Sequence, residues 1–162
     1  MGPVSWYNDG NDHNNVHGVW LNGQTVDDAL WRDIATLTEV RRIDLGSTNV
    51  QDEDLSNLRN HWNIRTLSLA NTQITTAGVQ SISDLETLET LTLRNTRIDD
   101  GAIDSLAKLK NLEGLSLIET DMSPGGIRQL RSRLPKCRIT CDTSLKAELS
   151  RRGLSLRHAR EH

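Results

Sequence analysis

The sequence predicts an α/β solenoid of short strand–helix units, with a parallel sheet along one side. The first observation is a repeat: pairs of apolar residues that flank a single residue begin at positions 19, 43, 67, 91, 115 and 139. The second is a change of apolar spacing inside each 24-residue unit. A fixed period of this length is typical of solenoids, because one unit cannot bury its apolar side without its neighbours.

Each unit begins with a predicted strand, as at residues 67–69, where apolar and polar residues alternate. Turn-forming residues follow, as in Ala70-Asn71-Thr72. The apolar spacing then becomes three, as in Val79, Ile82 and Leu85, which indicates one or two helical turns. We therefore expect a strand, a turn, a short helix and a return loop in every unit.

Apolar columns with the 24-residue step predict the core. Two of them are Trp31, Leu55, Val79, Ile103 and Ile127, and Ile34, Leu58, Ile82, Leu106 and Leu130. A polar column, Thr48, Thr72, Thr96 and Thr120, falls in the turn after each strand. Threonine hydroxyls can bond backbone groups in such a bend, and we expect a stacked ladder that satisfies loop amides.

The predicted helices carry start signals. Ser123 before Pro124 matches a helix cap followed by proline at the first helical position. Asp27-Asp28 and Asp99-Asp100 place acids where the helix dipole is positive. We interpret Gly125-Gly126 as room for close packing.

The two ends depart from the repeat and divide the chain into three parts. Residues 1–18 are predicted to form an N-terminal cap segment, residues 19–142 the repeats, and residues 143–162 a capping helix and a basic tail. The last helix should run from about Leu145 to Arg152 and end at Gly153.

The unit consensus is L-x-L-x-N-T-x-I-x-D-x-G-x-x-x-L-x-x-L-x-x-L. It resembles the leucine-rich repeat, in the bacterial 24-residue subtype with Thr where many repeats carry Asn. The stretch from Leu134 to Ile139 resembles the last repeat of bacterial members. The resemblance implies a right-handed βα solenoid with about six parallel strands on the concave side and short helices on the convex side. It also implies that the concave face binds another protein.

Composition limits the alternatives. Apolar residues make up 35% of the 162 positions and aromatic residues 3%, with no Phe, so the core must consist of Leu and Ile. The mean hydropathy is −0.53, and no apolar run approaches the roughly 18 residues of a membrane span. The first 25 residues lack the basic start and apolar stretch of a secretory signal.

The two cysteines, Cys137 and Cys141, lie about 13 Å apart on an extended chain, too far for a disulfide. We therefore expect buried, reduced thiols that react slowly. This usage suits a reducing compartment, and we predict a cytoplasmic location.

Charge is unevenly distributed: residues 127–162 carry +7 and residues 1–126 carry −10. We interpret the basic segment as a solvated capping helix. The alternative is a nucleic-acid or acidic-surface binder that uses this segment. The absence of Phe and Tyr from the segment argues against stacking on bases. A further alternative is a structural scaffold fragment of a larger protein.

No pattern indicates catalysis. A Ser-His-Asp order, a phosphate-binding loop and an H-E-x-x-H motif are all missing. His13 and His17 sit among Asn and Gly, so we interpret them as part of a polar loop rather than a metal site. The acidic pairs occupy helix starts. The sequence thus predicts a protein that is not an enzyme and holds no cofactor and no metal.

The candidate binding site is the outward side of the strands. Most of its residues are Ser, Thr, Gly or Ala, which supply little binding energy, whereas Trp and Arg are favoured at hot spots. The residues that we assign to partner binding are Trp20, Arg42, Asp44, Arg94, Ile118 and Glu119. We expect Arg94 and Ile118 at the centre of the patch, Trp20 at its edge if exposed, and a monomeric chain that binds an unidentified protein partner.

Overall fold

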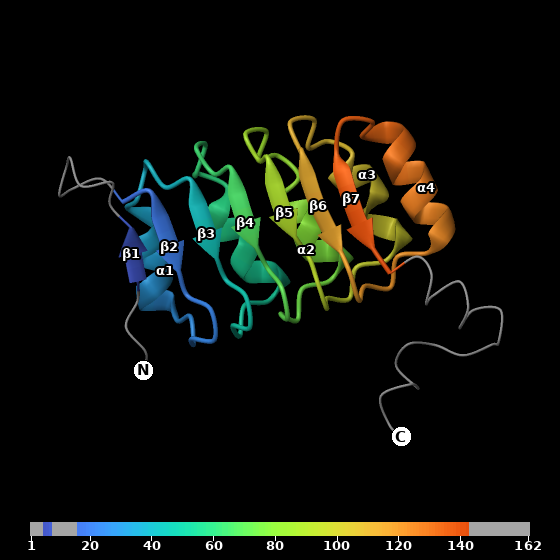
Figure 1. Ribbon diagram of the computed structural model, residues 1–162. Coiled ribbons are helices and arrows are strands. Elements are labelled where there is room, and N and C mark those ends of the chain that lie inside the picture. The colour runs from blue at the N-terminus through green and yellow to red at the C-terminus, as the bar shows by residue number, and fades with distance from the viewer. Residues whose placement is uncertain (1–4, 8–15, 143–162) are drawn as a thin grey trace, which may run out of the picture.

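A computed structural model describes residues 5–7 and 16–142, which form one seven-stranded sheet with helices behind it (Figure 1). The strands follow one another in chain order. Six of them are parallel: β2 (Gly18–Trp20), β3 (Arg42–Asp44), β4 (Thr66–Ser68), β5 (Thr90–Thr92), β6 (Gly114–Leu117) and β7 (Arg138–Cys141). Each pairs with the next at a shift of 24 residues, as in Ile43 opposite Leu67, so the predicted repeat sets the register.

The helical segments that return the chain lie on the other side of the sheet (Figure 1). They are α1 (Asp28–Ala35), η1 (Asp52–Leu58), α2 (Thr76–Ser81), η2 (Asp100–Ala102), α3 (Ile103–Leu106) and α4 (Pro124–Arg133), the two η segments being 3₁₀ helices. The predicted cap is confirmed at Ser123, and Asp27, predicted only as an acid at a helix start, also caps its helix. The Asp27 side chain accepts from the Leu30 amide, and the Ser123 side chain accepts from the Gly126 amide, with Pro124 in the first turn.

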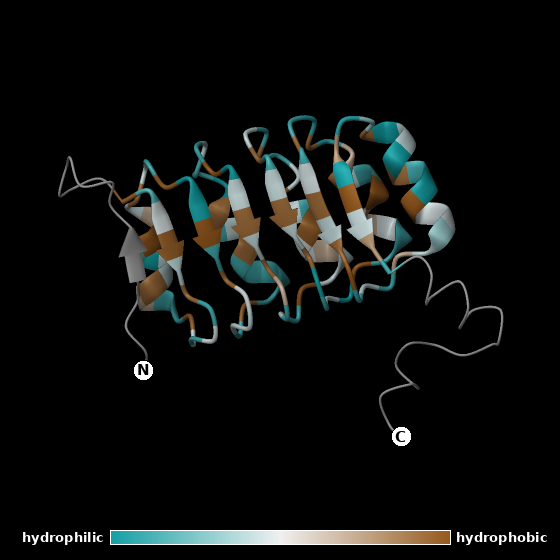
Figure 2. Ribbon diagram, viewed as in Figure 1, coloured by the Kyte–Doolittle hydropathy of each residue, from teal (hydrophilic) through white to brown (hydrophobic). Residues whose placement is uncertain are grey.

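The predicted apolar columns are buried between the sheet and the helices. Both columns that begin at Trp31 and Ile34 are at most 6% exposed, and so are Val40, Ile64, Leu88 and Leu112. The middle of each parallel strand is hydrophobic and the connecting loops are mostly hydrophilic (Figure 2). Sequential units therefore share one continuous core, as a solenoid requires.

The threonine column lies in the bend after each strand, as predicted, and its members are buried. Each hydroxyl donates to the carbonyl oxygen three residues earlier, for example Thr72 to Leu69 at 2.7 Å and Thr96 to Leu93 at 2.6 Å. The expectation of a ladder that satisfies loop amides is wrong. The hydroxyls satisfy strand carbonyls within their own repeats, while the bend amides pair with the next repeat, as in Asn71 N–H to Arg94 O at 2.8 Å.

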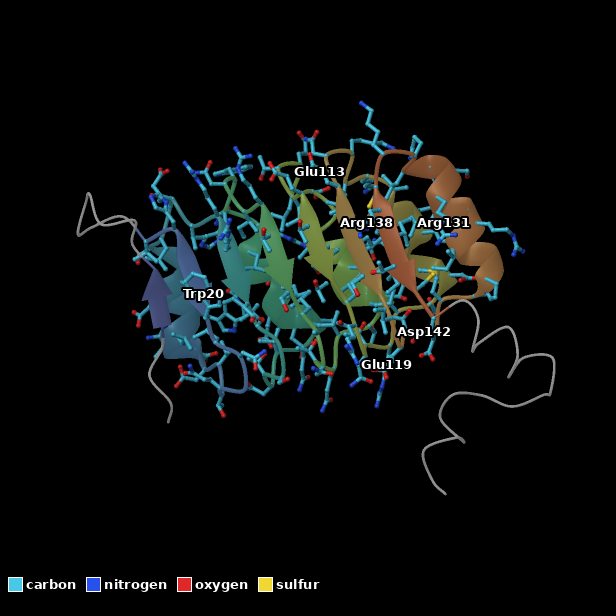
Figure 3. The ribbon with its side chains drawn as sticks, in the orientation of Figure 1. Trp20, Glu113, Glu119, Arg131, Arg138 and Asp142 are labelled. Atoms are coloured by element: carbon cyan, nitrogen blue, oxygen red, sulfur yellow. The ribbon has the colours of Figure 1, made fainter. Side chains whose placement is uncertain are left out.

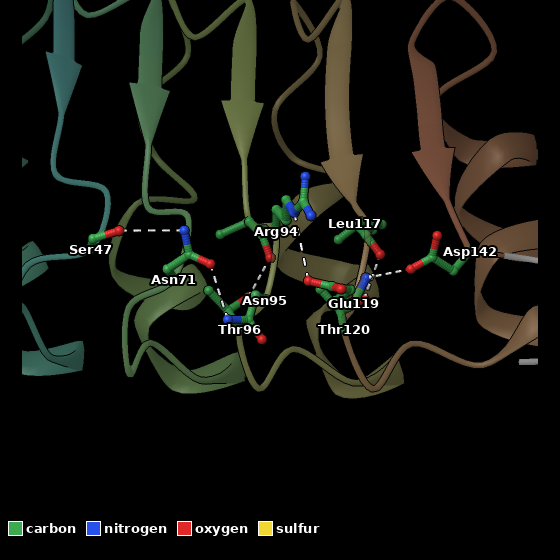
Figure 4. Close-up of polar contacts among 10 residues, drawn as sticks. Ser47, Asn71, Arg94, Asn95, Thr96, Leu117, Glu119, Thr120 and Asp142 are labelled. Carbon is green, nitrogen blue, oxygen red and sulfur yellow. Dashed lines mark hydrogen bonds and ion pairs between the residues drawn. The ribbon is translucent and has the colours of Figure 1, made fainter. Parts of the chain in front are cut away.

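The residue just before each threonine of this column, and Gly23 at the same position of the first repeat, has a positive φ. The values are 73° at Gly23, 56° at Ser47, 57° at Asn71, 53° at Asn95 and 58° at Glu119. Glycine and asparagine tolerate this left-handed conformation, and other residues adopt it at a cost. The Asn of the unit consensus therefore has a backbone role. The asparagines also stack, since Asn95 Nδ2 donates to Asn71 Oδ1 at 3.0 Å (Figure 4).

The first edge of the sheet holds a strand that the sequence pattern did not predict. Within the expected cap segment, β1 (Ser5–Tyr7) pairs antiparallel with β2, with Trp6 opposite Val19. The edge of the first repeat is thus covered by backbone pairing. The predicted C-terminal capping helix lies outside the described residues.

Cys137 and Cys141 are free thiols that pack beside the core. Both are half-buried, which corrects the expectation of full burial, because β7 is the last strand of the described sheet and no described repeat covers its far side. Desolvation by burial raises the pKa of the Cys137 thiol. A raised pKa lowers the thiolate fraction at neutral pH and slows alkylation.

A carboxylate from one repeat caps the helical segment of the next at two places. Asp52 Oδ1 accepts from the Thr75 amide and Asp100 Oδ1 from the Ser123 amide, both at 2.8 Å. The Ser123 hydroxyl also donates to the carboxylate of Asp100. A Cβ at Gly78 or Gly126 would lie 2.4 or 2.1 Å from the same carboxylate oxygens. Glycine is therefore required wherever the preceding repeat supplies this aspartate.

Gly126→Ala is expected to lower the free energy of unfolding by about 1–3 kcal/mol, because the added methyl displaces the Asp100 carboxylate. Thermal or denaturant unfolding measures the effect. Gly125→Ala is the matched control: a Cβ there lies 3.4 Å from its nearest neighbour, in ordinary contact, so stability should hold or rise.

Asp100→Thr should offset part of the Gly126→Ala loss, since Thr76 and Ala102 occupy these two positions one repeat earlier. Equal stability of the Gly125→Ala and Gly126→Ala variants would show that the carboxylate does not need the glycine.

One histidine occupies a leucine position of the core. The equivalent positions of three other repeats hold Leu37, Leu85 and Leu109. His61 itself is 2% exposed. A ring nitrogen, Nε2, lies 2.9 Å from the Ile34 carbonyl, while Nδ1 is buried without a hydrogen-bond partner among the described residues. An unsatisfied buried polar atom reduces stability.

His61→Leu is expected to raise the free energy of unfolding by about 1 kcal/mol, since it removes the unsatisfied nitrogen. The Ile34 carbonyl keeps its bond from the Leu37 amide at 2.9 Å. The melting temperature should rise by about 2–4 °C for a chain of this size. His61→Ala, which leaves a cavity, should melt earlier than the parent. A lower melting temperature for His61→Leu would mean that the bond to Ile34 outweighs the unsatisfied atom.

Candidate interaction face

The candidate site is the face of the sheet opposite the helices, which no described helix covers (Figure 1). Alternate strand residues emerge there because successive side chains of a strand point to opposite faces. In its centre lie Ser68, Thr92 and Ser116, all half-buried by their neighbours on the same face. This centre is a hydroxyl-bearing surface without charge.

Trp20, Arg42 and Asp44 lie together at the N-terminal end of the sheet, on β2 and β3. Trp20 is directly opposite Asp44 in the parallel register. The indole lies over Gly18, where a Cβ would be 2.3 Å from a ring carbon, so Trp20 is half-buried on its own strand. Asp44 Oδ1 accepts from the Gly46 amide at 2.9 Å, and Arg42 is exposed.

Arg94 and Glu119 lie together where β5 and β6 finish (Figure 4), and Ile118 directly follows β6. Arg94 Nε is 3.6 Å from Glu119 Oε2. Ile118 is half-buried, and its carbonyl accepts from the Asn95 amide at 2.9 Å. The Glu119 amide donates to Asp142 Oδ2 at 3.0 Å. We call Arg94, Ile118, Glu119 and Asp142 the Arg94–Glu119 patch.

The six predicted residues therefore form two groups. Arg94 follows β5, three strands beyond β2, so Trp20 lies at least about 14 Å from the Arg94–Glu119 patch at a strand spacing of about 4.8 Å. Figure 3 shows Trp20 over the N-terminal strands and Glu119 and Asp142 at the opposite lower edge of the sheet. A small ligand cannot contact both groups, whereas an extended partner that crosses the strands can.

Glu119 occupies the left-handed position of its repeat with φ 58°. A residue with a Cβ is strained there, and strained backbone clusters at functional sites. Asn occupies the same position in two other repeats, so the fold does not demand glutamate. Glu119 is thus held at a cost, beside Arg94 and Asp142.

Within the described residues, no group of three or more His, Cys, Asp or Glu side chains could hold a metal ion. His17 is half-buried, with Nδ1 3.3 Å from the Glu39 carbonyl, and His13 lies outside the described residues. The acidic residues at the helix starts are engaged in capping, as Asp52 and Asp100 show. They have the structural role that the sequence indicated.

Part of the basic C-terminal segment is also engaged in structure. On α4, Arg133 forms an ion pair with Asp104 of the preceding repeat. Arg131 Nη2 lies 3.4 Å from the Ile139 carbonyl and 3.9 Å from Cys141 Sγ. Arg138 lies on the open face near the top of β7 (Figure 3). Arg128 and Lys136 of this segment are exposed, and its other basic residues come after residue 142.

One exposed residue, Trp62, was not predicted from the sequence. Its side chain is 73% exposed, and it is the only large hydrophobic residue exposed in the described part of the chain. The equivalent positions of three other repeats hold Thr38, Glu86 and Lys110. A tryptophan in a polar column was the signal that could have identified it.

Comparison with known structures identifies the fold. A leucine-rich-repeat protein of Leptospira interrogans matches 67% of this chain, with a TM-score of 0.50 and 24% sequence identity. Internalin C2 of Listeria monocytogenes matches 85% of this chain and 67% of its own length, with a TM-score of 0.55 and 22% identity. No family model and no curated protein matches the sequence.

The chain therefore has the leucine-rich-repeat fold that the unit consensus predicts. The match covers 27% of the Leptospira protein, so this chain spans about a quarter of its length. Repeat solenoids of this kind are often used to bind proteins through their extended faces. No helix in the described ranges is long and apolar enough to cross a membrane.

Glu119→Asn is expected to raise the free energy of unfolding by about 1 kcal/mol, because asparagine tolerates a positive φ better than glutamate. The lost pairing with Arg94 is partly exposed to solvent and offsets little of the gain. The melting temperature should rise by about 2–4 °C in a thermal scan. Ser47→Asn, at the same position of another repeat, should raise it as well.

Glu113→Asn is the control for the Glu119 experiment, because Glu113 is exposed and lies outside the positive-φ positions. Its melting temperature should not change. If Glu119→Asn melts no later than the Glu113 control, the backbone at Glu119 carries no strain.

Proposed function

We propose that this leucine-rich-repeat domain is a non-catalytic interaction module that binds a partner protein through the open face of its sheet. The observation that supports this most directly is the Arg94–Glu119 patch. On a face of small hydroxyl side chains, it combines an exposed arginine, a half-buried isoleucine and two carboxylates. Arginine at a partly desolvated position is typical of interface hot spots.

The size of the face favours an elongated partner. Six strands at about 4.8 Å spacing form a strip about 24 Å long, which is small beside the roughly 800 Å² per partner of a standard interface. A partner that also reaches Trp20, Arg42 and Asp44 would use both groups and the smooth surface between them. We therefore propose an extended protein segment or a flat protein surface laid across the strands.

Binding rather than catalysis is favoured by what the side chains already do. The threonine hydroxyls of the bends donate to strand carbonyls, as Thr72 does. The hydroxyls of Thr75 and Ser123 donate to the carboxylates of Asp52 and Asp100. In both cases the aspartate of the preceding repeat caps a helix start. Asp44 on the open face accepts from the Gly46 amide. These groups therefore have structural partners that account for their positions.

Nucleic-acid binding through the basic segment is the alternative function. Arg133 and Arg131 of that segment already contact Asp104 and the Ile139 carbonyl of this chain. Fewer of its positive charges are therefore available to a phosphate backbone. Salt separates the two functions, since binding to phosphates falls steeply with salt concentration.

The free thiols favour a reducing compartment, which supports the cytoplasmic location.

Photo-crosslinking tests which face binds. A photoreactive residue at position 90, exposed on the open face, should capture a discrete protein in an extract of the cells that make this chain. The same residue at position 80, exposed on α2, is the matched control and should not capture that protein. Capture from position 80 alone would assign binding to the helical side.

Arg94→Ala and Ile118→Ala should each weaken binding to the captured, purified partner by about 1–2 kcal/mol, as loss of a hot-spot side chain does. Isothermal titration calorimetry measures the affinity, and melting curves should stay close to the parent because both residues are at the surface. Arg128→Ala removes an exposed arginine from α4 and should leave affinity unchanged. Parental affinity in both face variants would show that the patch is misplaced.

A further inference from the structure

Trp62 marks a second surface, at the edge of the sheet where the parallel strands begin. It lies in the loop between η1 and β4, and its side chain is 73% exposed. Polar residues serve at the equivalent position in three other repeats, so packing does not explain a tryptophan there. Exposed tryptophan is costly in water and is enriched in binding hot spots.

The loop that carries Trp62 is held rigidly. On either side of Trp62, His61 and Ile64 are buried in the core. The Trp62 carbonyl accepts from the Thr87 hydroxyl at 2.7 Å, and Asn63 Nδ2 donates to the Thr38 carbonyl at 3.0 Å. Neighbouring repeats therefore fix the loop from both sides. A rigid aromatic anchor loses little conformational entropy when a partner binds.

Three exposed arginines lie in this loop and the adjacent one. Arg59 and Arg65 lie in the same loop region as Trp62, and the Arg65 amide donates to the Arg41 carbonyl at 2.8 Å, which places Arg41 in the adjacent loop. Arg65 forms an ion pair with Glu89. Neither Arg41 nor Arg59 has an ion-pair partner within residues 16–142. We call Trp62, Arg41, Arg59 and Arg65 the Trp62 edge.

The next loop along the same edge has the opposite charge. Asp84, Glu86 and Glu89 precede β5, whereas the loop before β6 holds Lys108 and Lys110 beside Glu113. The edge therefore carries net positive charge in the loop before β4 and net negative charge in the loop before β5. Opposite charges steer an approaching partner and set its orientation.

We propose that the Trp62 edge is a docking surface for an acidic protein segment that carries an apolar side chain beside its carboxylates. The apolar side chain packs on the exposed indole, and the carboxylates pair with Arg41 and Arg59. The acidic loop before β5 repels the same segment and directs it toward the N-terminal repeats. The Trp62 edge lies where the strands begin, and the Arg94–Glu119 patch lies where they end. The two surfaces can therefore be occupied at once.

Peptide selection on the full chain tests the proposal, because a random library samples acidic and apolar segments without a named partner. A displayed library of random twelve-residue peptides is selected on the intact protein at low salt, and enriched peptides are synthesised with a fluorescent label. Fluorescence anisotropy then measures their affinity for the parent and for Trp62→Ser. Trp62 is exposed and contributes no core packing, so this variant should melt like the parent.

The expected result is a set of peptides rich in Asp and Glu around one apolar residue. Their affinity should fall at least tenfold in Trp62→Ser and in the double variant Arg41→Ser and Arg59→Ser, and should fall as salt is raised. Arg94→Ala should bind them like the parent, which separates this surface from the proposed function of the open face. Replacing the peptide's acids by Lys, or its apolar residue by Ser, should abolish binding.

Three results would overturn the proposal. The first is that no peptide is enriched on the parent over Trp62→Ser. The second is that the enriched peptides are not acidic or bind Trp62→Ser as tightly as the parent. The third is concentration-dependent self-association of the parent that Trp62→Ser abolishes, measured by analytical ultracentrifugation, since the occupant would then be the acidic edge of a second copy of this chain.

Discussion

Backbone pairing between successive repeats at a fixed shift of 24 residues governs the rest of the structure. The ladder does not stop where the strands end: the Leu45 amide donates to Ser68 and the Ser47 amide to Ala70, and the same pattern recurs one repeat later. To keep these bonds while it turns away from the sheet, the chain adopts a positive φ at the same position of every bend. The threonine that follows then closes the bend by donating to a strand carbonyl. An insertion within a strand or its bend would put the bonds to both neighbouring repeats out of register.

The same stacking explains which positions are fixed and which are free to serve binding. Where one repeat supplies a carboxylate to the helix start of the next, as Asp100 does for Ser123, glycine must follow at 126. Columns whose role is structural are nearly uniform, as the buried Leu and Ile columns are. Residues that break a column without a packing reason are therefore the best candidates for contact with other molecules. Glu119, strained in an Asn position, and Trp62, exposed in a polar position, are the two that the structure makes most conspicuous.

These departures fall on different sides of the molecule. The Arg94–Glu119 patch lies where strands β5 and β6 end, and Trp62 lies in a loop before β4 begins. A solenoid allows this separation because each repeat contacts only its neighbours, so a change on one surface need not disturb another. The open face offers a smooth strip with charged ends, whereas the edge offers one rigid aromatic side chain among arginines. We expect the first to suit a broad, weakly charged partner surface and the second a short acidic segment.

The sequence by itself determined the repeat, the order of strand and helix in each unit, the core columns and the leucine-rich-repeat fold. The physical reason is that a fixed period forces identical burial in every unit, so one unit predicts all. It also selected Arg94, Ile118 and Glu119 as candidates for partner binding. Only the tertiary structure decided that Trp20 lies three strands from Arg94, that Trp62 is exposed, that β1 covers the first edge and that the aspartates reach into the following repeat. These depend on side-chain direction and on contacts between repeats, neither of which the spacing of residues along one chain specifies.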